Sequence, residues 1–345
     1  MSLAEAFADQ SASCTRLGSP FMGRLFAILA RDWTTNSALD RYFASFTGDI
    51  GPAGASLPLR IAGGLHALVL SGRAAALAAT YPPHDVSDAQ LGMAIHDALK
   101  KHEAFLLEWV GSAPQTNEVR RSAALMAGAA VVKTLSDLPV WLSELGASGG
   151  LNLMWDHFAL HLPRARLGAQ PAVLTLAPEW HGPLPPLELP EIAARGAVDL
   201  NPLDPREPSD LLRMSAFLWP DQPERLALTQ AAASVIDTPV TRGDAIAWLS
   251  DRIATAPEGH IHLIQHTVAW QYFPPSRQTE GRRMIEAAGA ACDANRPIAW
   301  LSMETDGDKE GSVGAALTLR FWPGDVTLHL GRADFHGRWI KWAGA

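Results

Sequence analysis

The chain has 345 residues, of which 48% are hydrophobic and 19% are charged, and its formal net charge is −8. This composition is that of a globular protein with a sizeable core, and the length allows one large or two modest domains. The negative charge argues against a general affinity for nucleic acids or anionic membranes, so we expect a small-molecule substrate as partner. Cys14 and Cys292 cannot build a disulfide framework, and no basic leader opens the sequence, so we expect a cytoplasmic protein.

The first 135 residues or so are predicted to be helical, because no alternating strand pattern occurs there. Apolar spacing and cap residues predict four helices: one opened by Ser19-Pro20, one over 59–79, one capped by Ser87 or Asp88 that continues to Trp109, and one over 118–135 capped by Asn117. We therefore expect a helical domain over residues 1–136.

From Pro139 onward, strand patterns alternate with helix patterns. The expected strands are 140–145, 172–176, 197–200, 261–270, 298–303, 315–321 and 326–330, and the expected helices are 151–160, 208–218, 222–236, 244–254 and 278–291. This alternation implies a parallel sheet, and the last two strands flank a Pro323-Gly324-Asp325 turn that indicates an antiparallel hairpin. The fold class is therefore α/β: a helical domain followed, over 137–345, by a Rossmann-like parallel sheet with a terminal antiparallel hairpin.

The most informative segment is 140–153, where an apolar run ends in a carboxylate, a turn of small residues follows, and a helical pattern begins. Small residues let the backbone approach a ligand closely, and a helix start offers free N–H groups. The spacing Glu-x-Gly-x-Ser-x-Gly is similar to the first motif of S-adenosylmethionine-dependent methyltransferases. That resemblance implies a methyltransferase-type sheet and a cofactor-binding turn, with contacts from Glu144, Gly146, Ala147, Ser148, Gly150 and Asn152.

Three other interpretations of the turn compete. The three-glycine dinucleotide fingerprint fails, because Ser148 and Leu151 occupy the positions of its second and third glycines. Residues 146–150 do match the Gly-x-Ser-x-Gly elbow of α/β-hydrolases, and Ser148, Asp306 and His336 supply the order Ser, Asp, His. However, such hydrolases place several strands before the elbow, where this chain has helices. The third interpretation is a tight turn that binds no ligand.

Ligands of open parallel sheets sit beyond the carboxyl ends of the strands, and this rule selects further candidates. Asp199 and Asp204 are candidates to hold the ribose of a nucleoside cofactor, and Glu179 competes with Asp199 for this role. The alternative for Asp199 and Asp204 is that each carboxylate only stabilises a turn or caps a helix. Catalytic candidates are His266, Glu304 and Tyr272, since a base helps when the methyl acceptor has a proton to lose.

Histidines at 260, 262 and 266 share one face of a predicted strand. His260 and His266 would lie roughly 20 Å apart on a regular strand, so they cannot share one ion. We therefore predict no metal site.

Several segments together resemble a family of bacterial proteins, domain-of-unknown-function family 2332. They are residues 64–68, 115–119 with Arg121, 144–153, 198–204, 219–220, 224–225, 271–272 and 336–339. The resemblance covers most of the chain. It implies a helical N-terminal domain fused to a methyltransferase-like Rossmann domain, and it implies no particular reaction.

One of these segments forms a polar cluster that a simple helix cap does not need, namely Gln115, Thr116, Asn117, Glu118 and Arg121. With the family resemblance, it is expected to close over the cofactor turn; a capping role alone is the alternative. The expected function is an S-adenosylmethionine-dependent methyltransferase acting on a small molecule. The alternatives are a non-catalytic nucleoside- or nucleotide-binding protein and a serine hydrolase that uses Ser148.

Overall fold

The fold is taken from a computed structural model, which describes residues 1–33, 36–51, 54–307 and 313–344. The chain forms two compact units, one of Met1–Thr116 with Glu207–Ala227, the other of Asn117–Arg206 with Leu228–Ala345. The sequence pattern predicts that the helix before the first strand lies in the helical domain, with a boundary after residue 136. In the structure that helix packs on the sheet, so it belongs to the second unit.

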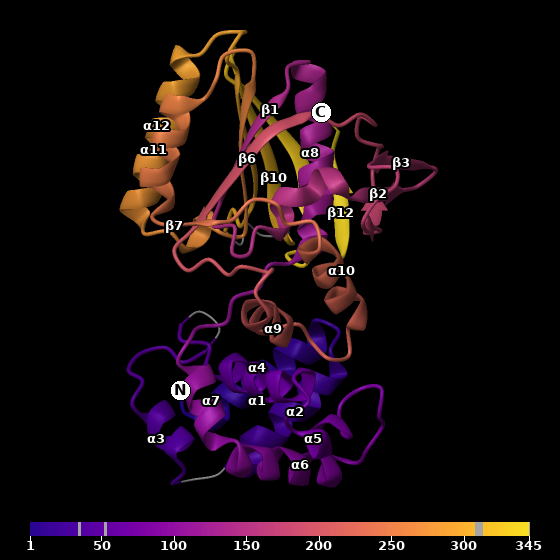
Figure 1. Cartoon of the computed structure of the whole chain (residues 1–345), viewed down its shortest axis with the longest axis vertical. Coiled ribbons are helices and arrows are strands. Elements are labelled where there is room, and N and C mark those ends of the chain that lie inside the picture. Colours follow the sequence, from indigo (N-terminus) through magenta and orange to yellow (C-terminus); the bar gives the residue numbers. More distant parts are fainter. Residues whose placement is uncertain (34–35, 52–53, 308–312, 345) are drawn as a thin grey trace. The chain divides into compact units, whose positions relative to one another are not determined.

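The first unit is helical (Figure 1). Its helices are α1 (Leu3–Arg16), α2 (Pro20–Asp32), α3 (Ala38–Ala44), α4 (Leu57–Leu70), α5 (Ala75–Ala78), α6 (Asp88–Lys101), α7 (Glu103–Val110) and α9 (Pro208–Ala216). Ser19 caps α2 and Ser87 caps α6, as predicted, because each side chain accepts an N–H of the first turn. The expected helix 59–79 is wrong as one element: Gly72, with φ +71°, lies in the break after α4.

His66 of the 64–68 segment and the preceding Gly63 lie where α9 docks on α4. A Cβ at Gly63 would lie 2.5 Å from the ring of Phe217, so only glycine lets the segment after α9 approach this closely. Nδ1 of His66 lies 3.2 Å from the carbonyl oxygen of Ala216. Asp221 then accepts hydrogen bonds from the Ser19 hydroxyl and the Phe21 N–H at the start of α2. Residues 207–227 therefore complete the helical core although they are distant in sequence.

In the part of the second unit that the structure describes, nine strands form one sheet, in the order β5-β12-β11-β10-β9-β8-β1-β6-β7. Their bounds are β1 (Val140–Leu145), β5 (Glu179–His181), β6 (Ile192–Asp199), β7 (Thr241–Arg242), β8 (Ile261–Thr267), β9 (Ile298–Glu304), β10 (Ala315–Trp322), β11 (Val326–Ala333) and β12 (Trp339–Trp342). Strands β7, β6, β1, β8 and β9 are parallel, whereas β9 to β12 run antiparallel. The predicted parallel sheet and the β10–β11 hairpin are confirmed.

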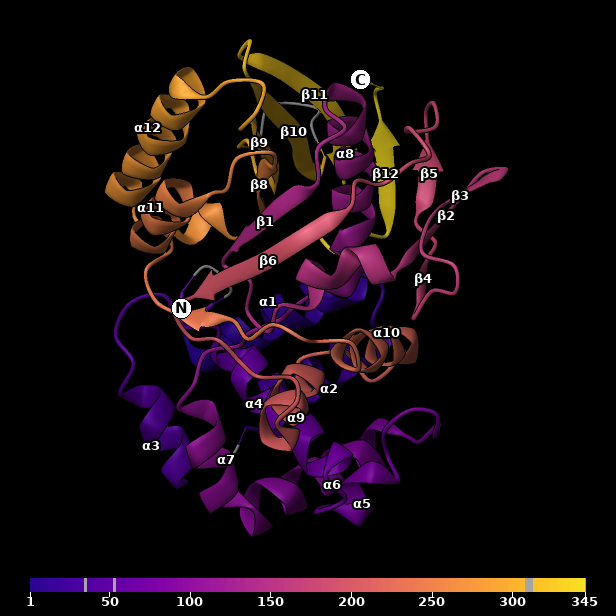
Figure 2. The ribbon, with the colours of Figure 1, turned by 45° about the horizontal axis from the view of Figure 1, so that its top comes forward.

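Helices cover both faces of this sheet (Figure 2). The short helix η1 (Val119–Arg121) leads into α8 (Ser122–Leu135) on one face, and α11 (Ala245–Thr255) and α12 (Pro275–Ala291) lie on the other. Gly128 of α8 packs against Leu301, whereas the neighbouring Trp300 belongs to the core beneath α11 and α12. Successive side chains of β9 thus pack on opposite faces of the sheet, because side chains alternate between the two faces along a strand.

The segment after β1 differs from its prediction. In place of the expected helix 151–160 there is a 3₁₀ segment, η2 (Leu151–His157), which is kinked at Met154, where the backbone is not helical. Then follow β2 (Ala159–Leu162), β3 (Ala165–Gly168) and β4 (Thr175–Leu176), which form a separate small sheet. The strand expected at 172–176 is therefore not part of the main sheet.

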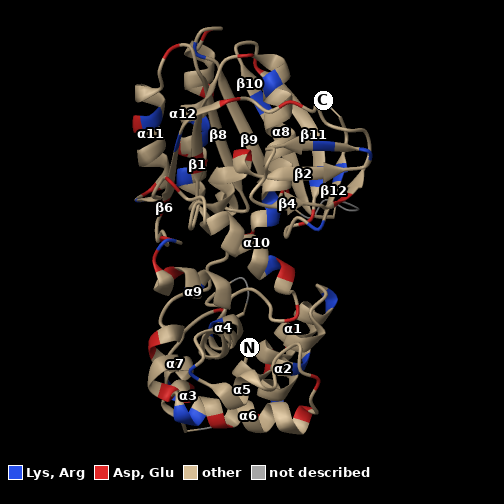
Figure 3. Ribbon diagram, turned by 45° about the vertical axis from the view of Figure 1, so that its right-hand side comes forward, with Lys and Arg blue, Asp and Glu red and all other residues tan. Residues whose placement is uncertain are grey.

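The remaining elements are α10 (Pro223–Ala233), which begins in the first unit and ends in the second, and η3 (Trp270–Tyr272) after β8. Acidic and basic residues are interspersed on both units (Figure 3). None of the helices in the described ranges is both long and apolar enough to cross a membrane.

Candidate functional site

The candidate site lies at the carboxyl ends of β6, β1 and β8. The five parallel strands lie side by side in the order β7-β6-β1-β8-β9. Numbered by their order along the chain, they are the third, second, first, fourth and fifth of these strands. The order reverses between β1 and β8, and the connections from these two strands leave in opposite directions. In open α/β sheets, ligands bind in the crevice beyond the strands at such a switch point.

The glycine turn, residues 146–150, follows β1 directly. The φ angles of Gly146, Ser148 and Gly150 are positive, at +67°, +55° and +76°. Glycine adopts positive φ more easily than other residues, which accounts for glycine at positions 146 and 150. The N–H groups of Gly146 and Ala147 both donate to the carbonyl oxygen of Val198, at 2.9 and 3.1 Å. The turn is therefore folded against the end of β6.

A loop after β8 closes the other side of the glycine turn. A Cβ at Gly146 would lie 2.5 Å from the Cβ of Ala269, so these two segments touch. Val268, just before Ala269, has φ +50°, an unusual conformation for a β-branched residue. The two chain segments at the switch point thus each contain a strained non-glycine residue, Ser148 and Val268. Such strain concentrates at functional sites.

Asp199 fixes the turn from the end of β6. Its Oδ2 accepts the Ser148 N–H at 2.9 Å and its Oδ1 accepts the Asn201 N–H at 2.8 Å. A carboxylate has about four lone-pair sites, so each oxygen can still accept a ligand hydroxyl. Its competitor Glu179 lies in β5 at the far edge of the sheet, beside His181. The structure thus places Asp199, and not Glu179, next to the glycine turn.

Asp204 lies on the same loop but is engaged elsewhere. Both of its oxygens accept hydrogen bonds from Arg206, at 2.9 and 2.7 Å, and these bonds lower the pKa of the Asp204 carboxyl. The loop itself touches the turn, since the Leu203 N–H donates to the Ser148 carbonyl oxygen at 3.3 Å.

Glu144, the carboxylate of the motif, is buried at the end of β1. Its Oε2 accepts from Nε2 of Gln265 at 3.2 Å, and Oε1 of Gln265 accepts the indole N–H of Trp155 at 3.0 Å. An indole nitrogen can only donate, so Trp155 fixes which end of the Gln265 amide faces Glu144. Burial raises the pKa of Glu144 to about 8. Neither Gln265 nor Trp155 was predicted, because each partner comes from a distant element.

Asn117 and Asn152 hold the helix that follows the turn. Oδ1 of Asn117 accepts the Leu151 N–H at 2.8 Å, and Oδ1 of Asn152 accepts the Ser122 hydroxyl at 2.7 Å. The prediction that Asn117 caps its own helix is wrong: Glu118 caps η1 instead, accepting the Arg120 N–H. Because this neighbour supplies the cap, the Asn117 side chain can fold toward the turn.

The rest of the expected pocket-closing cluster is divided. Buried Glu118 pairs with Arg120 at 3.1 Å. Arg121 donates to the carbonyl oxygens of Phe335 at 2.8 Å and Thr267 at 3.3 Å, so it lies at the carboxyl end of β8. Gln115 and Thr116, half-buried and exposed, are the last residues of the first unit's N-terminal segment.

His266 and Glu304 form a closed network at the ends of β8 and β9. Nδ1 of His266 lies 2.7 Å from Oε1 of Glu304, and Nε2 accepts the Trp300 indole N–H at 2.9 Å. Glu304 also accepts the N–H groups of residues 269 and 270, at 2.9 and 3.1 Å. Although burial raises the pKa of Glu304, the bonds from His266 and the backbone lower it more.

Both ring nitrogens of His266 have hydrogen-bond partners in this network. Since Trp300 must donate to Nε2, the ring proton sits on Nδ1 and points at Glu304. His266 therefore anchors the loop after β8 in this conformation. Tyr272, the third catalytic candidate, is 74% exposed at the end of that loop.

The hydrolase candidates are arranged differently from a triad. Oδ1 and Oδ2 of Asp306 each accept a hydrogen bond from Arg332 at 2.9 Å. The Ser148 hydroxyl has no hydrogen-bond partner among the described residues, and β1 is the first strand in the described chain.

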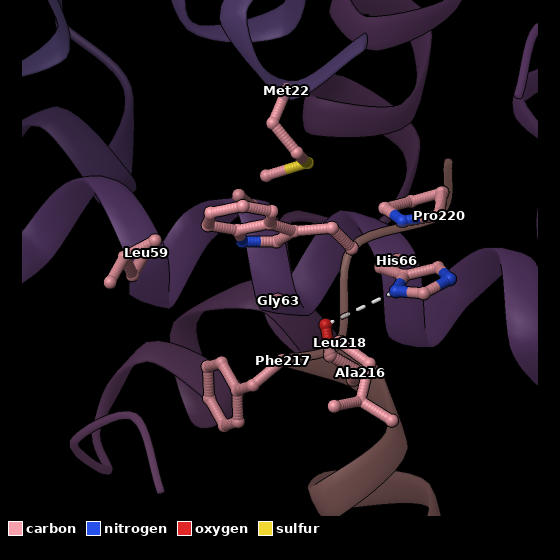
Figure 4. Close-up of a pocket in the computed structure, with 10 residues that line it drawn as sticks. Met22, Leu59, Gly63, His66, Ala216, Phe217, Leu218 and Pro220 are labelled. Atoms are coloured by element: carbon pink, nitrogen blue, oxygen red, sulfur yellow. Dashed lines mark hydrogen bonds between the residues drawn. The ribbon is translucent and has the colours of Figure 1, made fainter. Parts of the chain in front are cut away.

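Several cavities lie away from the glycine turn, and two of them contain histidines of the sequence patterns. One, of about 360 Å³, is lined by the amino ends of β8 and β9, with His260 and His262 among its residues. The other, in the first unit, is lined by His66 and the segment after α9 (Figure 4); its volume of about 10 Å³ suits one water molecule. Across the described ranges, no three His, Cys, Asp or Glu side chains are grouped to hold a metal ion.

The chain belongs to the family described as an uncharacterized protein conserved in bacteria (DUF2332), whose model matches residues 4–342. The family resemblance drawn from the sequence segments is confirmed. No curated protein and no solved structure matches the chain. The family description names no reaction, so the function has to be argued from the site.

Proposed function

We propose that this member of the DUF2332 family is an S-adenosylmethionine-dependent methyltransferase that acts on a small molecule. The observation that carries the proposal is the strand order β7-β6-β1-β8-β9, which puts the 144–150 motif at a switch point. Nucleoside cofactors bind at that position in doubly wound sheets.

The residues around the turn fit such a cofactor. Asp199 ends the strand next to β1 and keeps lone pairs for two ribose hydroxyls. The buried Ser148 hydroxyl lacks a partner among the described residues, and buried polar groups normally have one. A bound polar ligand would supply it.

The cofactor, when bound, supplies an activated methyl group. The protein's task is then mainly to hold the acceptor in line with that group at near-attack distance. Asp199 and the glycine turn fix the nucleoside, and the His266–Glu304 network holds the adjacent loop. Because His266 has no free nitrogen, the acceptor is one that needs no proton removal by this histidine.

A second candidate is a protein that binds a nucleoside without catalysis. The observation in its favour is the same engagement of His266 and Glu304, which leaves the predicted base occupied. Both candidates bind a nucleoside or nucleotide at the glycine turn, but only the first requires an adenosyl cofactor and transfers a methyl group.

Calorimetric titration with S-adenosylhomocysteine, S-adenosylmethionine and NAD tests the proposal. We expect both adenosyl compounds to bind and NAD not to bind. Asp199→Asn should weaken adenosyl binding at least about tenfold, because it removes the charge that accepts the ribose hydroxyls. Asp204→Asn is the matched control and should bind like the wild type, since Asp204 is engaged by Arg206. A wild type that binds no adenosyl compound would end the proposal.

A bulky residue in the glycine turn would be a poorer test than Asp199→Asn. From the sequence, Gly150→Val is expected to block ligand approach in a folded protein. However, Gly150 has φ +76° and a Cβ there would lie 3.0 Å from Cγ2 of Val240, so valine would strain the fold itself. Asp199→Asn keeps the size of the side chain and requires no change of backbone conformation. Its amide nitrogen cannot accept the N–H that one Asp199 oxygen accepts, so the melting temperature of the variant has to be measured together with its ligand binding.

A further inference from the structure

A cavity of the second unit is lined by a buried histidine that the proposed function does not use. Its volume is about 360 Å³, which is within the range of small-molecule sites. Apolar side chains of α11, α12 and β9 form part of its wall, namely Ile253, Ala288 and Ile298. The cavity lies at the amino ends of β8 and β9, whereas the glycine turn follows the carboxyl end of β1. The two sites are therefore at opposite ends of the parallel strands.

The buried histidine is His262, which is 2% exposed. Its Nε2 lies 2.9 Å from the hydroxyl oxygen of Ser143, and the same oxygen accepts the Nε–H of Arg252 at 3.0 Å. In the described part of the chain the Ser143 hydroxyl has no other acceptor, so its proton points at Nε2 and the ring proton sits on Nδ1. Nδ1 is buried and lacks a hydrogen-bond partner among the described residues. The ring thus has an unpaired N–H donor, and buried donors are normally paired.

The charge nearest to this donor is positive, which favours an anion as its acceptor. The half-buried Arg252 packs on two indole rings, with its Cζ 4.1 Å and 5.4 Å from the ring centroids of Trp141 and Trp248. Within the described ranges, no carboxylate pairs with Arg252. Burial, and after it the Arg252 charge, lowers the pKa of His262 to about 3, so the ring is neutral at neutral pH. The hydrogen bond from Arg252 polarises the Ser143 hydroxyl and, through it, the ring, which strengthens the Nδ1–H as a donor.

Charges of both signs surround the opening of the cavity. Glu258, Asp293 and Arg296 also line it, and all three are exposed, so solvent screens their charges. The carboxyl ends of α11 and α12, which lie beside them, carry partial negative charge. A ligand with several negative charges would be repelled there. The cavity therefore suits a compound with one carboxylate and an otherwise uncharged, apolar body.

We propose that this cavity binds a small monocarboxylic acid, whose carboxylate accepts the Nδ1–H of His262 and whose apolar body lies between α11 and α12. Nδ1 is covered in this structure, so the carboxylate reaches it only after side chains at that end of the cavity turn aside. The inference goes beyond the proposed function and does not depend on it, because the cavity shares no residue with the glycine turn.

Calorimetric titration of the full chain with benzoate and with benzamide tests the inference, since benzamide has the shape of benzoate without its charge. We expect benzoate to bind with a dissociation constant of about 1 mM or lower. Benzamide should bind at least about tenfold more weakly, because a charged acceptor makes the stronger hydrogen bond. His262→Phe should remove this preference, because phenylalanine has no ring nitrogen. S-adenosylhomocysteine should not displace benzoate.

A second variant tests the same cavity without touching the buried hydrogen bonds. Ala288→Leu puts a larger side chain into the cavity wall, and it should abolish benzoate binding without lowering the melting temperature. Ala287→Leu, at an exposed position of α12 outside the wall, is the matched control and should bind benzoate like the wild type. The inference is wrong if the wild type does not bind benzoate at about 10 mM, or if binding survives either His262→Phe or Ala288→Leu unchanged. Displacement of benzoate by S-adenosylhomocysteine would also overturn it, because the carboxylate would then lie at the glycine turn.

Discussion

Glu144→Gln gives a quantitative test of the buried network at the end of β1. The ordinary pKa of this carboxyl is 4.5, and burial raises it to about 8 in the folded protein. The folded state therefore keeps a proton that the unfolded state releases. The stabilising contribution of the protonated carboxyl is complete below pH 4.5 and is lost as the pH rises through 8. A pKa difference of about 3.5 corresponds to about 5 kcal/mol at most.

Glutamine keeps the size of Glu144 and an oxygen that can accept from Gln265, but it cannot ionise. The free energy of unfolding of Glu144→Gln, relative to that of the wild type, should therefore rise by several kcal/mol between about pH 5 and pH 8. Urea unfolding at a series of pH values measures this difference. Glu179→Gln, at an exposed carboxyl of the same sheet, is the matched control and should show no such trend. Parallel pH profiles for Glu144→Gln and the wild type would refute the reasoning.

Two further variants test the positioning residues of the site. His266→Phe should lower the free energy of unfolding by about 2–4 kcal/mol, because it leaves the Trp300 indole N–H and the Glu304 carboxylate without their partner; an unchanged melting temperature would mean that His266 does not anchor the loop. Asn117→Ala should cost about 1 kcal/mol of stability and weaken S-adenosylhomocysteine binding, because the Leu151 N–H loses its acceptor. Asn295→Ala, in an exposed loop, is its control and should change neither property.

Local signals in the sequence predict local structure well. The serine caps of α2 and α6, the strand before the glycine turn and the terminal hairpin all depend on residues close together in the chain. For the same reason, the amino-acid pattern alone suffices to put the small-residue turn at the end of β1. The sequence could not decide whether Asp199 or Glu179 lies beside this turn, because the choice depends on the order of the strands in the sheet.

Features that depend on distant partners could not be predicted. Asn117 looks like a helix cap in sequence, and only the fold brings it to Leu151, 34 residues later. His266 looks like a free base, and its indole partner is also 34 residues away. The docking of α9 on α4 joins residues about 150 positions apart, so periodicity within either helix gives no sign of it.

A crystal structure of the protein grown with S-adenosylhomocysteine tests the central claim most directly. We predict that the nucleoside lies beyond the carboxyl ends of β6 and β1, with its ribose on Asp199. A nucleoside bound elsewhere, for example in the cavity at the amino ends of β8 and β9, would contradict it, as would crystals in which the compound does not bind at millimolar concentration.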